Sequence, residues 1–164
     1  MMRTRRMVLS AMLALLGGAT AAAQSVAPSS DKVDALSDAS RKGDAAAVKA
    51  LLDAGVDVNT KFRYNRTALS FAADRGHVEV VKLLLERGAD VAAKDTFYNA
   101  SALSWAVSPA MDRKPQHTDV VRLLLQRGGF SASDLSDALQ SATRAKLPDV
   151  VALLEKAGAK PKDK

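Results

Sequence analysis

Two segments of the chain share one pattern of apolar and polar positions. The segment 77–88 reads as an amphipathic helix with charged residues opposite its apolar stripe, and the segment 117–128 repeats it almost residue for residue. Gly88 and Gly128 close these runs, at the position where a left-handed glycine commonly ends a helix. The first stripe consists of Val78, Val81, Leu84 and Leu85.

A second, shorter helix is predicted ahead of each of these. Thr67 and Ser101 stand at the start of apolar segments, where a hydroxyl oxygen can accept a hydrogen bond from a free helix N–H. Ala72 and Ala73 are small enough to let neighbouring helices approach closely. One helix pair cannot bury such a stripe, whereas a stack of three or more pairs can.

The spacing of equivalent residues shows an internal repeat. The hexapeptide 64–69 matches 98–103, and Gly55 lies 33 residues before Gly88. Fainter copies cover 36–59 and 139–159. The period of 33 residues falls among those of known helical repeat architectures.

The third and fourth copies differ in length. Gly88 and Gly128 are 40 residues apart, so the third copy has seven extra residues, about six of them around 111–116. Gly128 and Gly158 are only 30 apart, which predicts a shortened connection in the last copy. Terminal repeats are often atypical because they cap the stack.

The second copy, 67–91, resembles the repeat of the ankyrin family, and the resemblance extends over residues 32–160. It implies an all-α solenoid of about four stacked helix-turn-helix repeats with short β-hairpin fingers. Asn65 and Asn99 occupy the position of the family's turn glycine, and asparagine tolerates the left-handed conformation that this turn needs. The repeats are expected at about 32–61, 62–94, 95–132 and 133–160.

The composition agrees with a folded helical chain. Hydrophobic residues make up 48% and charged residues 26%, while aromatic residues are only 4%, so alanine, leucine and valine must fill the core. The absence of cysteine excludes disulfides, thiolate metal sites and a cysteine-based lipid anchor. The lysine-rich C-terminal end, with a basic tail at 161–164, is expected to be a solvated tail and not a nucleic-acid-binding arm.

Residues 1–23 have the features of a cleavable signal peptide. Three arginines precede the apolar run 7–16, which is too short to span a bilayer, and Ala21 and Ala23 form a small-residue cleavage pattern before Gln24. Cleavage would leave 21 basic against 18 acidic residues, a net charge of +3. We expect residues 24–31 to be a linker and the mature protein to be periplasmic or, as a weaker alternative, secreted. The general and the twin-arginine export routes both remain open.

The sequence contains no recognisable catalytic motif, and no cofactor is expected. Its two histidines, His77 and His117, fall at the same repeat position without a third metal ligand at suitable spacing. We interpret both as structural residues that hydrogen-bond backbone between repeats, and we do not expect an enzyme.

The resemblance implies that a partner protein binds the concave face and the finger tips. Tyrosine and arginine, which are enriched in binding hot spots, cluster there. The candidate partner-binding residues are Arg63, Tyr64, Arg66, Asp74, Arg75, Phe97, Tyr98, Trp105, Met111, Arg113 and Lys114. Packing between fingers is an open alternative for Phe97 and Tyr98, and packing between repeats for Phe71 and Trp105.

The sequence therefore predicts a monomeric, non-catalytic module that binds an envelope protein and does not insert into the membrane after cleavage. Small exported ankyrin proteins of bacteria are associated with supporting an envelope enzyme or neutralising a toxin, and the sequence does not choose between these partners. The alternative is a secreted effector that mimics eukaryotic ankyrin contacts in a host cell.

Overall fold

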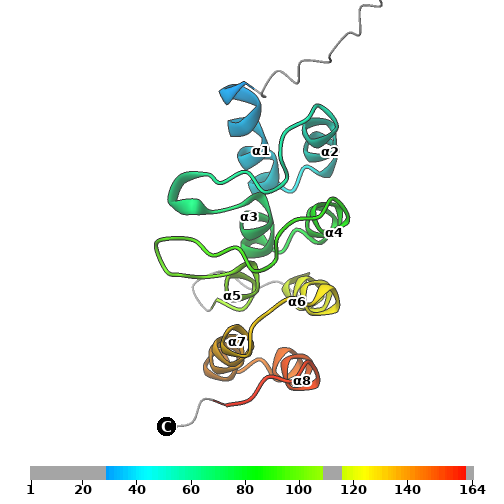
Figure 1. Ribbon diagram of the computed structural model, residues 1–164. Coiled ribbons are helices and arrows are strands. Elements are labelled where there is room, and N and C mark those ends of the chain that lie inside the picture. The colour runs from blue at the N-terminus through cyan, green and yellow to red at the C-terminus, as the bar shows by residue number, and fades with distance from the viewer. Residues whose placement is uncertain (1–28, 109–115, 162–164) are drawn as a thin grey trace, which may run out of the picture.

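The computed structural model describes residues 29–108 and 116–161, and within these ranges it contains eight α-helices and no strand. The helices form four antiparallel pairs stacked in chain order (Figure 1). They are α1 (Ser30–Lys42), α2 (Ala45–Asp53), α3 (Ala68–Arg75), α4 (Val78–Glu86), α5 (Ala102–Ala106), α6 (Gln116–Arg127), α7 (Ala132–Arg144) and α8 (Pro148–Lys156). The predicted all-α solenoid of four pairs is confirmed, although α1 begins inside the segment that we expected to be a linker.

The first helices of the pairs, α1, α3, α5 and α7, form one column, and the second helices form another (Figure 1). The core runs between the columns because each pair contributes leucines from equivalent positions. Leu69 and Leu103 in the first column and Leu84 and Leu124 in the second are fully buried. Burying a side chain of this size contributes about 1.5–3 kcal/mol. The predicted apolar stripe is therefore the surface that holds neighbouring repeats together.

The helix starts are capped as the sequence indicates. The Thr67 hydroxyl accepts the Ser70 N–H at 3.2 Å and Ser101 accepts the Ser104 N–H at 3.4 Å. In the last repeat Ser131 and Asp134 form a reciprocal capping box. Each cap satisfies an N–H that the helix itself leaves unpaired.

Asp134 also links the fourth repeat to the third. Its carboxylate accepts a hydrogen bond from Lys94 Nζ at 2.7 Å as well as from the N–H and hydroxyl of Ser131. Burial by itself would raise the pKa of Asp134, but the hydrogen bonds from Lys94 and Ser131 outweigh it and lower the pKa below its ordinary value.

The two histidines bridge successive repeats, as predicted. His77 Nε2 lies 2.9 Å from the carbonyl oxygen of Arg41, and His117 Nε2 lies 3.1 Å from that of Asp74. Gly43 gives His77 its space, since a Cβ at Gly43 would lie 2.5 Å from the imidazole Nδ1. The φ of Gly43, +80°, independently disfavours a side chain there.

Two long loops leave the stack between the pairs, and we call them fingers. The first finger (54–67) joins α2 to α3, the second finger (87–101) joins α4 to α5, and both project beyond the first helices on the side away from the second helices (Figure 1). The predicted β-hairpins are not confirmed. Instead, a short 3₁₀ turn, Arg63–Asn65, forms the tip of the first finger.

The finger turns use the left-handed conformation at the predicted asparagines. The φ angle is 56° at Asn65 and 52° at Asn99. Tyr64 is also left-handed, with φ 60°, which the sequence did not indicate because this conformation is unfavourable for an aromatic residue. The connection from α6 to α7 is short and has no finger, as the shorter spacing predicts.

Candidate functional site

Asp95 fixes the second finger to the helix that follows it. Its carboxylate accepts the backbone N–H groups of Phe97 at 2.9 Å and Tyr98 at 2.7 Å through one oxygen. The other oxygen accepts the indole N–H of Trp105 on α5 at 2.9 Å. The side chain is buried and all its bonds are local, so the fingertip has a defined position before any partner arrives. Asp95 was not among the predicted site residues, although an aspartate side chain commonly forms a turn by accepting the backbone N–H two residues further on.

The tips of the two fingers are joined to each other. Thr96 N–H donates to the Tyr64 carbonyl at 2.9 Å, and the rings of Tyr64 and Phe97 have centroids 5.4 Å apart. Phe97 continues to Tyr98 edge to face at 4.5 Å, and Tyr98 continues to Trp105 at 5.7 Å. These four rings, Tyr64, Phe97, Tyr98 and Trp105, form one strip from the fingertips to α5, which we call the aromatic strip.

Most of the aromatic strip is open to solvent. Tyr64 is 47%, Phe97 63% and Tyr98 67% exposed, and within the described ranges these are the large hydrophobic side chains that are exposed. Phe97 therefore packs against the other finger, as the open alternative had it, whereas Tyr98 packs against Phe97 of its own finger and Trp105 of α5. Both still present more than half of their surface. A concentrated exposed apolar patch on an otherwise polar protein marks an interaction surface.

Arginines extend the strip across the first three repeats. The Arg66 guanidinium lies between two rings, with its Cζ 4.2 Å from the centroid of Phe71 and 4.1 Å from that of Trp105. Arg41 of α1 stacks on Phe71 at 4.0 Å. Phe71 is only 3% exposed and thus packs between repeats, while Trp105 is half-buried. At the other end, Arg63 lies over Tyr64 at 4.9 Å.

Arg66 and Asp74 form a partly buried ion pair at the centre of this arrangement. Arg66 Nη2 donates to Asp74 Oδ2 at 3.2 Å and to the Ser70 carbonyl at 3.1 Å. Burial lowers the pKa of Arg66, and the neighbouring Asp74 carboxylate opposes this shift. Within the described part of the chain, Arg66 Nε and Asp74 Oδ1 are buried and have no hydrogen-bond partner.

The structure places Asp74 differently from Arg75, although both were predicted to face a partner. Asp74 is 4% exposed and paired, whereas Arg75 is exposed. The predicted residues Met111, Arg113 and Lys114 lie outside the described residues. The structure thus brings together Arg63, Tyr64, Arg66, Asp74, Phe97, Tyr98 and Trp105.

A cavity opens beside the aromatic strip, between α3 and α5. Its volume is about 480 Å³, within the range of small-ligand pockets. Its wall combines two aromatic side chains, an ion pair and two serines. The described residues that line it are Arg66, Asp74, Tyr98, Ala100, Ser104, Trp105 and Ser108.

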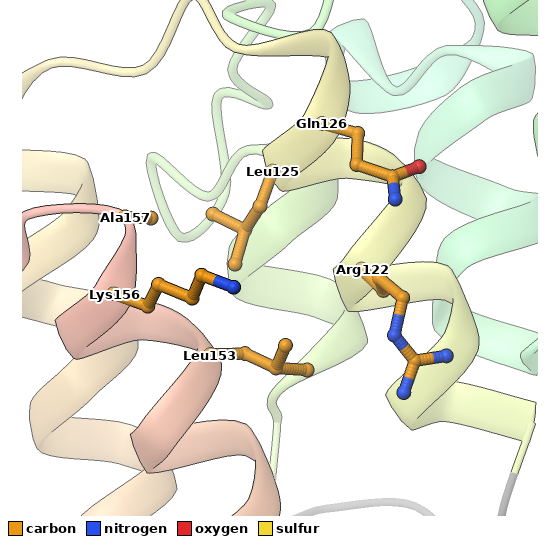
Figure 2. A pocket seen from close by; sticks show the side chains of 6 residues that line it. All are labelled: Arg122, Leu125, Gln126, Leu153, Lys156 and Ala157. Carbon is orange, nitrogen blue, oxygen red and sulfur yellow. The ribbon is translucent and has the colours of Figure 1, made fainter.

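The opposite face of the stack has hollows between neighbouring second helices. A hollow of about 310 Å³ lies between α6 and α8, lined by Leu125 and Leu153, and Lys156 extends from α8 toward Leu125 (Figure 2). Similar hollows separate α2 from α4 and α4 from α6. They recur wherever two second helices stack, so they follow from packing cylinders side by side and do not distinguish any repeat.

No group of three or more histidine, cysteine, aspartate and glutamate side chains suited to a metal ion occurs in 29–108 or 116–161. No helix in that part of the chain has the length and apolarity needed to cross a bilayer.

Comparison with known proteins identifies the repeat. A family model for ankyrin repeats, in three copies, matches residues 9–95, and no curated protein matches the chain. The matched range starts within the predicted signal peptide and ends before α5, while the stack continues through α8. Ankyrin repeats generally serve as protein–protein interaction modules. Because the match covers more than half of the 164 residues and the helices form the stack that it implies, the chain belongs to the ankyrin-repeat family.

Proposed function

We propose that this protein is a non-catalytic interaction module of the bacterial envelope that binds a partner protein through the aromatic strip and the adjacent cavity. One observation carries the proposal: the exposed large hydrophobic side chains of the described residues gather on two joined fingertips. Tyrosine, tryptophan and arginine dominate binding energy in protein interfaces, and the strip consists largely of these types.

The strip is also ordered in advance. Asp95 holds the backbone of the second fingertip, and the bond from Thr96 to Tyr64 ties the two tips together. A surface that is already ordered loses less conformational entropy when it binds. This favours recognition of one partner over a loose, adaptable contact.

The partner proposed from the sequence is another envelope protein, either an enzyme that the module supports or a toxin that it neutralises. The signal peptide predicted at residues 1–23 supports this compartment. The family match, in contrast, begins at residue 9 and would make part of that segment a repeat. Mass spectrometry of the mature protein tests whether the segment is a signal peptide or part of a repeat. An N-terminus at Gln24 in the periplasmic fraction is the expected result. A retained N-terminus would contradict export, and recovery from the medium would favour the secreted effector.

The binding proposal is tested by affinity purification from the periplasm. The double variant Phe97→Ser with Tyr98→Ser removes apolar surface that is already exposed, so we expect a folded protein that loses its partner. The matched control, Lys82→Ser with Gln126→Ser, changes two exposed side chains on the opposite face. Recovery of the same partners with both double variants would refute binding through the strip.

A further inference from the structure

The cavity beside Trp105 contains one hydrogen-bond acceptor that the protein itself leaves unused. The Asp95 carboxylate already accepts hydrogen bonds from three donors. Arg66 is engaged by the Ser70 carbonyl, by Asp74 Oδ2 and by the two rings that cover it. Asp74 Oδ1 remains without a partner, although Asp74 is 96% buried and lines the cavity. A buried acceptor left unsatisfied lowers the stability of the folded protein, and a donor from outside would recover that loss.

The charges around the cavity also favour a positively charged ligand. Two buried carboxylates, Asp74 and Asp95, stand against one guanidinium, Arg66. Arg41 is exposed to solvent on the far side of Phe71, and Arg63 is exposed at the first fingertip, so both are better screened. One additional positive charge in the cavity would neutralise the group.

The walls suit a cation with a long apolar stem. Trp105 and Tyr98 meet edge to face, and the faces of such rings attract the cationic groups of lysine and arginine. Ser104 contributes a further hydroxyl to the wall. Arg66 Nε is a buried donor that also lacks a partner. An anion is nevertheless disfavoured, because rings cover the guanidinium and the two buried carboxylates, Asp74 and Asp95, would repel it.

We propose that this cavity takes an arginine or lysine side chain of the bound partner, with Asp74 as its counter-charge and Trp105 and Tyr98 as its walls. The inference rests on the proposed function, because it names the chemistry by which a partner held on the aromatic strip would be recognised. A basic anchor residue would insert between α3 and α5 while neighbouring partner residues cover Phe97 and Tyr98.

The chain supplies its own probe for this test. Trp105 is the one tryptophan in the sequence, so tryptophan fluorescence reports directly on the cavity. The ligands are four capped tripeptides, acetyl-Gly-X-Gly-amide, in which X is Arg, Lys, Gln or Glu. We expect saturable fluorescence changes with the Arg and Lys peptides, at Kd values at least tenfold below that of the Gln peptide, and weakening at high salt. Equal or tighter binding of the Gln or Glu peptide, or no saturable response to Arg and Lys, would overturn the proposal.

Two variants test the role of Asp74. We expect Asp74→Asn to weaken binding of the Arg peptide at least tenfold. The matched control is Asp134→Asn, which alters the other buried, cation-paired aspartate, one that does not line the cavity, and should leave binding unchanged. If Asp74→Asn proves too unstable, the double variant Arg66→Met with Asp74→Asn removes both charges together. If this double variant still preferred the Arg and Lys peptides over the Gln peptide, that result would equally contradict the proposal.

The peptide series tests the ligand of the cavity and the affinity purification tests the aromatic strip as the interface, so the two proposals can be rejected independently. Loss of the partner from Phe97→Ser with Tyr98→Ser, combined with no preference for basic peptides, would sustain the aromatic strip as the interface and reject only the cavity's ligand. A preference for basic peptides together with unchanged partners would reject the strip as the interface and keep the cavity site.

Discussion

Replacing Arg66 by methionine tests how the core of the site is held together. Methionine keeps much of the length and apolar contact of the arginine stem but removes the guanidinium from between Phe71 and Trp105. Asp74, 4% exposed, would then lose its counter-charge. The variant therefore isolates the electrostatic part of the arrangement from its packing.

The size of the effect follows from burial. Breaking a buried ion pair by removing one partner costs about 3–5 kcal/mol, because the remaining charge is uncompensated. The Arg66 side chain is still 17% exposed, so water can reach the vacated site in part. We therefore expect Arg66→Met to lower the free energy of unfolding by about 2–4 kcal/mol, a large share of the roughly 5–15 kcal/mol that a domain usually has.

Urea unfolding followed by far-ultraviolet circular dichroism measures this loss without relying on Trp105, whose surroundings the variant alters. The control is Arg63→Met on the same finger, an exposed arginine that should change the stability by less than about 0.5 kcal/mol. Arg66→Met with Asp74→Leu should recover most of the loss, since a buried pair exchanged for apolar groups is often close to neutral. An Arg66→Met protein within about 1 kcal/mol of the parent, or a double variant as unstable as the sum of its parts, would refute the reasoning.

Two further predictions concern contacts between repeats. Asp134→Asn should cost about 1–2 kcal/mol at neutral pH by weakening the cap and the pair with Lys94. Because the folded protein lowers the pKa of Asp134, that stabilisation is present above the ordinary aspartate value and is lost as the pH falls through the folded one, so urea midpoints of parent and variant should converge below about pH 4. Gly43→Ala should destabilise by about 2–4 kcal/mol, because it adds a collision with His77 to left-handed strain, whereas Gly55→Ala, with similar φ and open space, should cost only about 1 kcal/mol. Equal thermal shifts for the two glycine variants would exclude the histidine contact as the reason.

The sequence predicts those features that one repeat specifies by itself. The leucine stripe, the caps at Thr67 and Ser101 and the left-handed turns at Asn65 and Asn99 need no knowledge of the neighbouring repeat. The histidine bridges were accessible as well, because His77 and His117 occupy the same position of two copies. Periodic constraints repeat in the sequence and are recognisable there.

The features that the sequence did not reveal are contacts that one repeat makes and its copies do not. Asp74 looks like any charged residue on an exposed helix face until Arg66, from the preceding finger, covers it. Asp95 gains its role only because α5 places the Trp105 indole within 2.9 Å of it. Neither contact recurs in the other repeats, so no periodic signal marks them.

This contrast bears on how the site is built. The contacts that recur from repeat to repeat are the ones that a solenoid needs to form its stack. The ion pair of Arg66 and Asp74 leaves two buried polar atoms unsatisfied, and the left-handed Tyr64 stores strain at the fingertip. Both lie within the aromatic strip or at the cavity beside it, where the fold does not require them. Among the described residues, buried polar atoms without a partner occur only beside the exposed aromatics, which is explained most simply if they belong to a binding surface. The basic peptides test that explanation at its most buried point.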